Sequence, residues 1–400
     1  MLMLDIFVDI VKILVKILMG YTAVMGILFL IPWKKYPVVS PKTRFAVLIP
    51  ARNEENVISH IVESLQSQNY PKDLYDIIVI PNNCTDDTEG AALRAGVKVM
   101  HCTGPVATKG EVLHQILDCI MGSYDAYLVF DADNIVDSEF LSRMNDAVAA
   151  GAKVAKSRQY ALNPYDNWVS GGYDLYFQSH TILHNRGRAP FNLSAKLVGT
   201  GFMVTDALLQ EMGGWNTVTL TEDIEFASQC AMLGYKVYFV PDAITYDEQP
   251  LSFKVSMRQR WRWSAGVQSV ANRYTSRLLS MRPTWLRWDL ASHINMIYVQ
   301  LLGLVPVLYG LFSSTFGGAL RIVGLAVLGF AGSSVLMALF LCVTARRNPM
   351  KQWKAILLYP LFLISWYPLH VRALFNKPKT WKPIVHGVDS SREKVKETVK

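Results

Sequence analysis

Apolar residues are concentrated in three long runs near the two ends of the chain. The runs are Ile17–Trp33, Ile294–Phe316 and Ile322–Thr344, and none of them contains a charged residue. The second and third runs have 23 residues each, and at about 1.5 Å per residue each can cross a hydrocarbon core of about 30 Å. The sequence therefore predicts membrane-spanning helices on both sides of a more polar middle part, Tyr36–Trp288.

The middle part alternates short apolar runs with segments of helical periodicity. The apolar runs predict four strands, at Arg44–Pro50, Asp76–Pro81, Val97–Met100 and Asp125–Phe130. The segments between and after them predict helices at Glu55–Gln66, Asp86–Ala95, Lys109–Cys119 and from Ser138 to Ala149. Thr85 is the predicted N-cap of the second helix, and Ser138 is the predicted N-cap of the fourth. Strands and helices at this spacing predict an α/β fold with a doubly wound sheet.

The first apolar run has two interpretations, a cleaved signal peptide or an uncleaved anchor. Lys12 and Lys16 precede it, as in a signal peptide, but no cleavage site of small residues follows it. The sequence Pro32-Trp33-Lys34-Lys35 is typical of a membrane exit, which favours the anchor.

Basic residues near the ends of the apolar runs predict the orientation, because they stay on the cytoplasmic side. They flank the middle part and follow the third run: Lys34, Lys35, Arg282, Arg287, Arg346, Arg347, Lys351 and Lys354. The link Ser313–Gly318 has none. We therefore expect a multi-pass protein of the cell membrane with its middle domain in the cytoplasm.

A last apolar run, Ala355–Leu369, is short for a span and contains Pro360 and Pro368, which favours a re-entrant or interfacial segment over a further crossing.

The expected plan has six parts: an anchor (1–35), a cytoplasmic domain (36–252), interfacial helices (253–290), two transmembrane helices (291–345), a loop with a re-entrant, interfacial or third C-terminal membrane segment (346–387), and a charged tail (388–400).

Composition agrees with a membrane protein. The chain is 51% hydrophobic and has a formal net charge of +8, which the basic flanks and attraction to anionic lipid headgroups explain. No basic stripe interleaved with aromatic residues occurs outside Gln259–Trp263, so we expect no nucleic-acid partner. The five cysteines show neither CxxC pairs nor ligand-like spacing with histidines, which argues against structural zinc.

Polar residues follow three of the predicted strands: Arg52-Asn53-Glu54, Asn82-Asn83 and Asp131-Ala132-Asp133. In a doubly wound sheet the ligand binds beyond the carboxyl ends of the strands. The sequence thus predicts a nucleotide-type crevice, without a dinucleotide glycine fingerprint or a phosphate-binding GxxxxGK loop.

Asp131 and Asp133 are candidate metal ligands. In extended backbone, residues i and i+2 point the same way, so both carboxylates reach one cation, and hard oxygen ligands suit Mg²⁺ or Mn²⁺. The alternative is a solvated loop. Lys109, at a predicted helix start, is a candidate phosphate ligand or else a surface lysine.

Two further motifs carry chemistry. Asp223 in Thr221-Glu222-Asp223 is a candidate general base; the alternative is a helix N-terminus that Thr221 caps. Gln259–Trp263 offers guanidinium groups for phosphate oxygens and indole faces for a sugar ring; the alternative is an interfacial Arg/Trp belt.

In chain order these motifs and one more, Gly199-Thr200-Gly201, form one set: Pro50-Ala51-Arg52-Asn53-Glu54, Asn82-Asn83-Cys84-Thr85-Asp86, Lys109-Gly110, Asp131-Ala132-Asp133, Gly199-Thr200-Gly201, Thr221-Glu222-Asp223 and Gln259-x-x-Arg262-Trp263. From Phe45 to Trp263 the chain resembles the membrane-embedded family 2 inverting glycosyltransferases, which include cellulose, chitin, hyaluronan and poly-N-acetylglucosamine synthases. The resemblance implies a GT-A fold, meaning a nucleotide-sugar-binding, doubly wound mixed sheet, with transmembrane and interfacial helices. It also implies a metal-dependent hexosyltransferase.

The resemblance implies roles for the acidic residues. Asp131 matches a contact to the nucleotide sugar, and Asp133 matches the ligand of the Mg²⁺ or Mn²⁺ ion and the diphosphate. Asp223, beside Glu222, matches the catalytic base. Lys109 belongs with the nucleotide-sugar contacts.

The remaining motifs match the two ends of the substrate site. Gln259, Arg262 and Trp263 match the group that holds the diphosphate and frames the acceptor sugar, Gly199-Thr200-Gly201 lies at the acceptor end, and Glu54 lies near uracil and ribose. Asn82 departs from the family, which usually has an Asp that binds uracil there. Its carbonyl oxygen still accepts from the uracil N3–H.

We therefore expect an inverting glycosyltransferase that uses a UDP-sugar, makes β-linkages and extends a cell-surface polysaccharide, with a growing glycan as acceptor. Such a polymerase needs an export path, for which it would self-associate or recruit an accessory subunit. One alternative is a glycolipid synthase that adds one sugar to a membrane lipid. Another is a non-catalytic scaffold or transport homologue.

Overall fold

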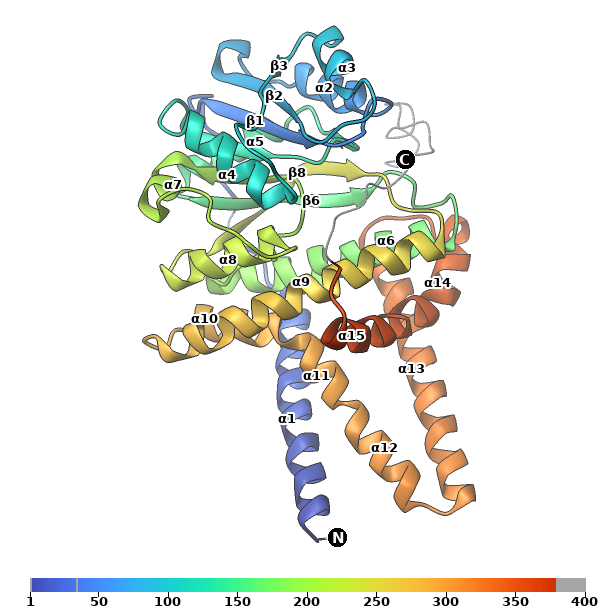
Figure 1. Ribbon diagram of the computed structural model, residues 1–400. Helices are drawn as coiled ribbons and strands as arrows, with labels where there is room; N and C mark the ends of the chain where they lie inside the picture. Colours follow the sequence, from blue (N-terminus) through green and yellow to red (C-terminus); the bar gives the residue numbers. More distant parts are fainter. Residues whose placement is uncertain (1, 34, 379–400) are drawn as a thin grey trace.

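The computed structural model describes residues 2–33 and 35–378, in which a sheet domain stands on a group of long apolar helices (Figure 1). The charged tail expected at 388–400 lies outside the described residues. Eight strands form one mixed sheet in the order β3-β2-β1-β4-β7-β6-β8-β5. Their bounds are β1 (Phe45–Ala51), β2 (Tyr75–Pro81), β3 (Lys98–Val99), β4 (Ala126–Val129), β5 (Asn134–Val136), β6 (Val154–Ala161), β7 (Phe202–Thr205) and β8 (Val237–Asp247).

The sheet is parallel in its N-terminal half and mixed beyond it. Strands β1, β2, β3 and β4 run parallel, β7 is antiparallel to both β4 and β6, β8 is parallel to β6, and β5 is antiparallel to β8. The parallel half places the ends of β1, β2 and β4 at one edge, as the alternation of strands and helices predicted. The mixed α/β sheet of a GT-A fold is confirmed.

Helices cover both faces of the sheet. They are α2 (Ile58–Gln66), α3 (Thr88–Arg94), α4 (Lys109–Ile120), α5 (Phe140–Ala149), α7 (Asp206–Met212) and α8 (Glu222–Met232), with the short 3₁₀ helix η2 (Lys72–Leu74). Alternate residues of β1 enter opposite cores: Phe45, Val47 and Ile49 pack with α2 and α5, whereas Ala46 and Leu48 pack with α4 and α7. This burial on both faces explains why β1 is apolar without interruption.

The four predicted strands and four predicted helices are present, with ends shifted by up to three residues. Both predicted helix caps are wrong. Helix α3 has Asp87 at its N-cap, because Thr85 is held by Asn53, whose side-chain oxygen accepts from the Thr85 N–H at 2.7 Å. Helix α5 starts after Glu139 without a side-chain cap, so the turn at Ser138 continues for one more residue than the sequence suggests.

The remaining helices lie below the sheet in Figure 1. They are α1 (Leu2–Ile27), η1 (Leu28–Leu30), α6 (Trp168–Ser179), the π-helix η3 (His180–Arg186), η4 (Ala189–Phe191), α9 (Phe253–Ser280), α10 (Trp285–Ile294), α11 (Met296–Leu302), α12 (Leu304–Ser313), α13 (Phe316–Thr344), α14 (Pro349–Ile364) and α15 (Trp366–Phe375).

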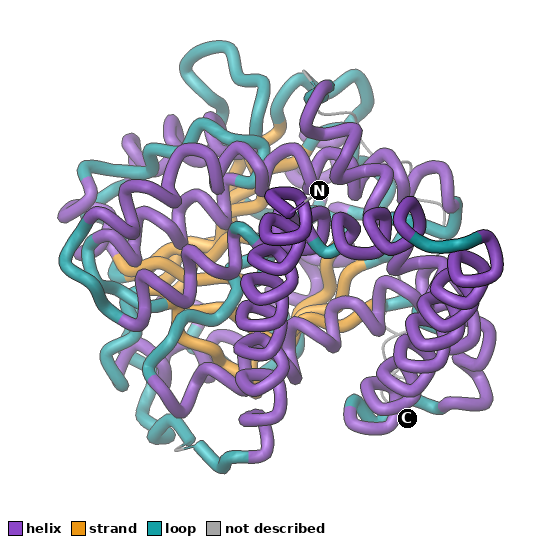
Figure 2. Tube along the Cα trace, turned by 90° about the horizontal axis from the view of Figure 1, so that it is seen from below, coloured by secondary structure: helices purple, strands orange, loops and turns teal. Residues whose placement is uncertain are grey.

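Four helical stretches in the described residues are long and apolar enough to cross a membrane: Leu2–Leu30, Met296–Ser313, Phe316–Thr344 and Pro349–Phe375. The last one is broken at Ser365. Its first half, α14, folds back against α13, and its second half, α15, turns beneath α9 (Figure 1). Seen from below, helices lie in front of much of the sheet (Figure 2). The re-entrant or interfacial course of this segment stays a prediction.

A buried ion pair joins the sheet domain to the α13–α14 hairpin. Arg347 Nη2 lies 2.8 Å from Asp174 Oδ1 on α6, and the two side chains are 4% and 0% exposed. Asp174 also accepts from Gln352 Nε2 at 3.1 Å and from the Ala161 N–H at 3.2 Å. Removal of one partner would leave the other charge buried without compensation.

We expect Arg347→Met to destabilise the protein by about 3–5 kcal/mol, because Asp174 then stays buried without its cation. The measurement is the midpoint of thermal unfolding in detergent micelles. The neighbouring Arg346→Met is the matched control, since Arg346 is exposed, and it should change stability by less than about 1 kcal/mol. Equal midpoints for both variants would contradict the structural role of the pair.

Candidate active site

One large cavity, about 1190 Å³ in volume, lies where the ends of the strands meet α9 and the membrane helices. Most of the residues singled out from the sequence line it: Glu54, Asn82, Lys109, Asp131, Asp133, Gly199, Thr200, Glu222, Asp223, Gln259, Arg262 and Trp263. Gly201 does not. A Cβ there would lie 2.4 Å from Ser157 Oγ, and its φ is +61°, so this glycine serves the packing behind the cavity.

Asp131 and Asp133 lie in a turn between β4 and β5, not in extended backbone, so the reason given for their shared direction is wrong. The Asn134 N–H donates to the Asp131 carbonyl at 3.3 Å and closes the turn, and the Asp131 N–H donates to Thr200 Oγ1 at 3.0 Å. Both carboxylates still line the cavity. Within residues 2–33 and 35–378 no three His, Cys, Asp or Glu side chains are grouped as a metal site.

Lys109 lies against the first of these carboxylates. Its Nζ donates to Asp131 Oδ1 at 2.5 Å and to the Gly199 carbonyl at 2.7 Å. Burial opposes its charge, but the carboxylates of Asp131, Glu222 and Asp223 outweigh burial and raise the pKa of Lys109. The lysine is thus a fixed cation at the N-terminus of the 12-residue helix α4, where the helix dipole also attracts phosphate.

Asp223 is held at the start of α8 by backbone groups. Its Oδ2 accepts from the Gly199 N–H, and its Oδ1 accepts from the Ile224 N–H at 2.8 Å. The alternative interpretation, a helix N-terminus that the Thr221 side chain caps, is not observed: Thr221 Oγ1 is buried with no partner among the described residues. Next to Asp223, burial raises the pKa of Glu222. Asp223 is therefore the oriented carboxylate, suited to accept a proton.

The motif on α9 divides between two faces of the helix. Gln259, Arg262 and Trp263 lie three and four residues apart and face the cavity. Tyr173 Oη donates to Gln259 Oε1 at 2.8 Å, and Arg262 Nη1 donates to the Leu220 carbonyl at 3.3 Å, just before the Thr221–Asp223 motif.

The other arginine of the motif, Arg260, has a different place. It is fully buried, and its Nη1 donates to the Phe362 carbonyl and to Ser365 Oγ, both at 2.9 Å. It therefore fixes the break between α14 and α15. Trp263 stacks near Trp366, with ring centroids 6.3 Å apart, so the C-terminal segment completes the aromatic wall beside the cavity.

Asn82 presents an acceptor to the cavity. Its Nδ2 donates to the Ala51 carbonyl at 3.0 Å. The side-chain carbonyl oxygen is then the atom left for a ligand, as expected for a group that binds a base N–H.

Sequence reasoning missed several residues of the cavity wall, among them Asp247, His180, Lys196 and His293. Asp247 Oδ2 accepts from Gln159 Nε2 at 2.9 Å, and burial raises the pKa of Asp247 to about 7. Its place at the end of a long apolar strand was a usable signal. The others lie on helices or loops without a motif, so no pattern in the sequence marks them.

Residues 41–266 match the sequence profile of the family described as Glycosyltransferase like family 2. The chain belongs to this family. It has the GT-A fold, and the likeness to a solved structure agrees with that fold. The mannosyltransferase PcManGT from Pyrobaculum calidifontis, in complex with GDP-Man and Mn²⁺, superposes with a TM-score of 0.64 at 16% identity, over 93% of this chain and 100% of that one.

Two curated relatives extend the comparison. The probable glycosyltransferase YdaM of Bacillus subtilis (strain 168) is 30% identical over 268 residues, which is 64% of this chain and 63% of that protein. The beta-monoglucosyldiacylglycerol synthase of Synechocystis sp. is 26% identical over 372 residues, which is 87% of this chain and 76% of that protein. The chain thus matches less than two thirds of the length of YdaM.

We expect Asp223→Asn to lower the rate of sugar transfer by about 10²–10⁴-fold, because the amide cannot take the acceptor proton. Binding of the nucleotide sugar, measured by calorimetry with the detergent-solubilised protein, should change little. The control is Asp242→Asn, an exposed position on β8, which should keep the full rate. Transfer at the normal rate by Asp223→Asn would exclude this residue as the base.

Proposed function

We propose that this enzyme transfers a hexose, with inversion, from a nucleotide diphosphate sugar to a hydroxyl group of a membrane lipid. One observation carries the proposal: the cavity that contains the strand-end carboxylates continues down to the membrane helices. Its lower wall is apolar and comes from α1 and α13, with Met19, Ala23, Gly26, Ile27, Phe330, Met337 and Phe340. A lipid held along this wall would place its headgroup beside Asp223.

The reaction is a single displacement. The acceptor hydroxyl attacks the anomeric carbon from the face opposite the diphosphate, and Asp223 takes its proton. The bond between the anomeric carbon and the diphosphate breaks, and the nucleoside diphosphate leaves with the electron pair. Arg262 and Lys109 stabilise the charge that develops on the leaving group. Inversion of an α-linked donor gives a β-linked product.

The residues at the end of β4 fit a divalent cation. Asp131 and Asp133 supply oxygen ligands, and with no third protein ligand grouped beside them in the described chain, the diphosphate would complete the coordination. When bound, Mg²⁺ or Mn²⁺ would neutralise charge on the leaving diphosphate.

The identity of the nucleobase in the sugar nucleotide is also part of the proposal. The Asn82 side-chain oxygen accepts an N–H, which uracil presents at N3 and guanine at N1. Uridine remains our first choice, on the resemblance of the motifs. The orientation proposed is the one that the basic residues predict, with the sheet domain in the cytoplasm.

A second candidate function is the polysaccharide synthesis that the sequence favoured. The aromatic wall formed by Trp263 and Trp366 supports it, because such faces bind sugar rings. A relative named glucomannan 4-beta-mannosyltransferase 7, from Arabidopsis thaliana, is 26% identical over 169 residues. Only this reading needs self-association or an export subunit.

The product distinguishes the two functions. Membranes that contain the enzyme are incubated with radiolabelled UDP-glucose, UDP-N-acetylglucosamine or GDP-mannose, and the product is partitioned between organic solvent and water. We expect the label in the organic phase, in a lipid that carries one sugar. Label in a water-soluble chain of many sugars would establish the polymerase instead.

Metal removal tests the carboxylate pair. We expect a chelator to abolish transfer and Mn²⁺ or Mg²⁺ to restore it. Asp133→Asn should raise the Mn²⁺ concentration needed for half-maximal rate, because it removes one charged ligand, whereas Asp73→Asn on the surface should not. A full rate in the presence of chelator would contradict a metal-assisted reaction.

A further inference from the structure

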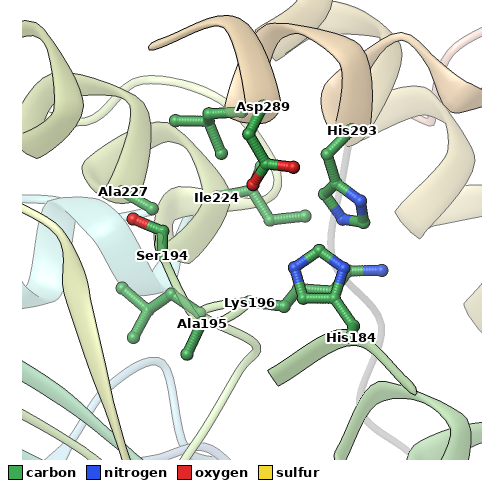
Figure 3. Close-up of a pocket in the computed structure, with 10 residues that line it drawn as sticks. His184, Ser194, Ala195, Lys196, Ile224, Ala227, Asp289 and His293 are labelled. Carbon is green, nitrogen blue, oxygen red and sulfur yellow. The ribbon is translucent and has the colours of Figure 1, made fainter. Parts of the chain in front are cut away.

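Basic side chains gather on the cavity wall close to both Asp223 and the membrane helix α1. Three separate segments supply them: η3 carries His180 and His184, the loop before β7 carries Lys196, and α10 carries His293. These four residues form what we call the basic cluster. Figure 3 shows His184 and His293 side by side, with Lys196 next to them. The transfer reaction described above uses none of the four.

The place of the basic cluster links the two halves of the cavity. Ile224, the residue after Asp223, lines the same small recess as Lys196, His184 and His293. On the other side, η3 packs against α1, where Leu183 Cβ lies 3.7 Å from the position that a Cβ of Gly26 would take. A ligand that extends from Asp223 to the apolar wall must therefore pass these side chains.

Lys196 is a cation without a carboxylate partner. Its Nζ lies 3.1 Å from His180 Nε2, and within the part of the chain that the structure describes it forms no ion pair. Burial lowers the pKa of Lys196 to about 8, although Asp223 opposes this shift, so the lysine still carries its charge at neutral pH. Partly buried charges are normally paired, and here an anion inside the cavity would supply the partner.

The histidines add neutral donors. The rings of His184 and His293 lie 4.2 Å apart, and burial holds the pKa of both well below the usual range. Neither ring hydrogen-bonds to another described residue. A neutral imidazole carries one N–H, so each ring has a donor for a ligand oxygen without adding a charge that Lys196 would repel.

A neighbouring ion pair holds the basic cluster in shape without neutralising it. Arg188 Nε donates to both oxygens of Asp289, at 3.1 and 2.9 Å, and Tyr21 Oη donates to the same carboxylate at 2.7 Å. Both charged side chains are 3% exposed. This contact ties η4, α10 and α1 together. It also engages the carboxylate of Asp289, which lines the same small recess as Lys196.

We propose that the basic cluster binds the phosphate of the acceptor lipid. This inference rests on the proposed function and adds the chemical class of the acceptor: a glycerophospholipid whose headgroup has a phosphodiester and a free hydroxyl. The acyl chains lie along α1 and α13, the phosphate contacts Lys196, and the hydroxyl reaches Asp223. The headgroup oxygen bonds to the anomeric carbon, its proton passes to Asp223, and the nucleoside diphosphate leaves.

Two chemical reasons favour a phosphodiester over other lipids. A phosphate monoester would attack through its own anionic oxygen, needs no base, and would be repelled by the carboxylate of Asp223. A neutral diacylglycerol would leave Lys196 partly buried without an anion. A phosphodiester whose headgroup carries the reacting hydroxyl supplies an anion to Lys196 and a hydroxyl to Asp223 at the same time.

The test compares acceptors and variants of the full-length protein. The enzyme is placed in phosphatidylcholine vesicles that contain an equal fraction of phosphatidylglycerol, diacylglycerol or undecaprenyl phosphate, and kcat/KM is measured for each lipid. We expect phosphatidylglycerol to exceed diacylglycerol by about 10–100-fold, the effect of charged hydrogen bonds. Lys196→Met should remove most of this preference, and Lys196→Arg should retain it.

A matched control and a second variant keep the outcome clear. Lys236→Met should keep the full preference, since Lys236 binds Asn192 Oδ1 outside the cavity. Binding of the nucleotide sugar shows that each variant is folded, and His293→Leu, which should reduce the preference partially, replaces Lys196→Met if that variant does not fold.

Each contrary result would overturn a different part of the proposal. A wild-type preference for diacylglycerol or for undecaprenyl phosphate would overturn the acceptor class and leave the lipid glycosyltransferase intact. An unchanged preference in Lys196→Met would overturn the basic cluster as the site. Water-soluble polymer with every lipid, and no glycosylated lipid, would instead overturn the proposed function.

Discussion

The proposed reaction joins a sugar nucleotide, which is dissolved in water, to a lipid acceptor, which is confined to a bilayer, so it needs a single cavity that opens to both. Helix α9 makes this cavity possible, because it lies between the sheet and the membrane helices (Figure 1). A Cβ at Gly266 would come within 2.4 Å of the Thr221 side chain. The helix can therefore lie directly against the start of α8, where Asp223 lies, and any larger residue would separate them.

The two arginines of α9 explain how one helix serves two parts of the molecule. Arg262 reaches the Leu220 carbonyl and lies at the sheet end of the cavity. Arg260 is buried among Phe253, Phe362 and Trp366, with its charge over their rings. It fixes the membrane-side segment relative to α9, so the aromatic wall keeps its place beside Gln259 and Arg262.

Charge is divided along the cavity in the same way. At the sheet end, Asp131, Asp133 and Asp223 lie with Lys109, a group that suits a cation and a diphosphate. At the membrane end the basic cluster faces the apolar wall of α1 and α13. The π-helix η3 contributes two residues to that end, and π-helical turns are frequent at functional sites because they re-aim side chains within a helix.

The sequence by itself determined the parts of this protein whose signal is local. Strand β1 is apolar on both faces, α9 presents its motif at helical spacing, and the apolar runs are long enough to be read as spans. These features follow from the periods of strands and helices and from bilayer thickness. The polar strand ends also predicted one edge of the sheet as the site.

Only the tertiary structure decided which groups meet. His180, Lys196 and His293 come from three segments without a motif, and their common place depends on how η3, the loop before β7 and α10 pack against one another. Likewise Asp131 and Asp133 share a turn, not a strand. Helices α3 and α5 begin after Asp87 and Glu139, not at the caps predicted at Thr85 and Ser138. Long-range packing has no local period, so no pattern along the chain could reveal it.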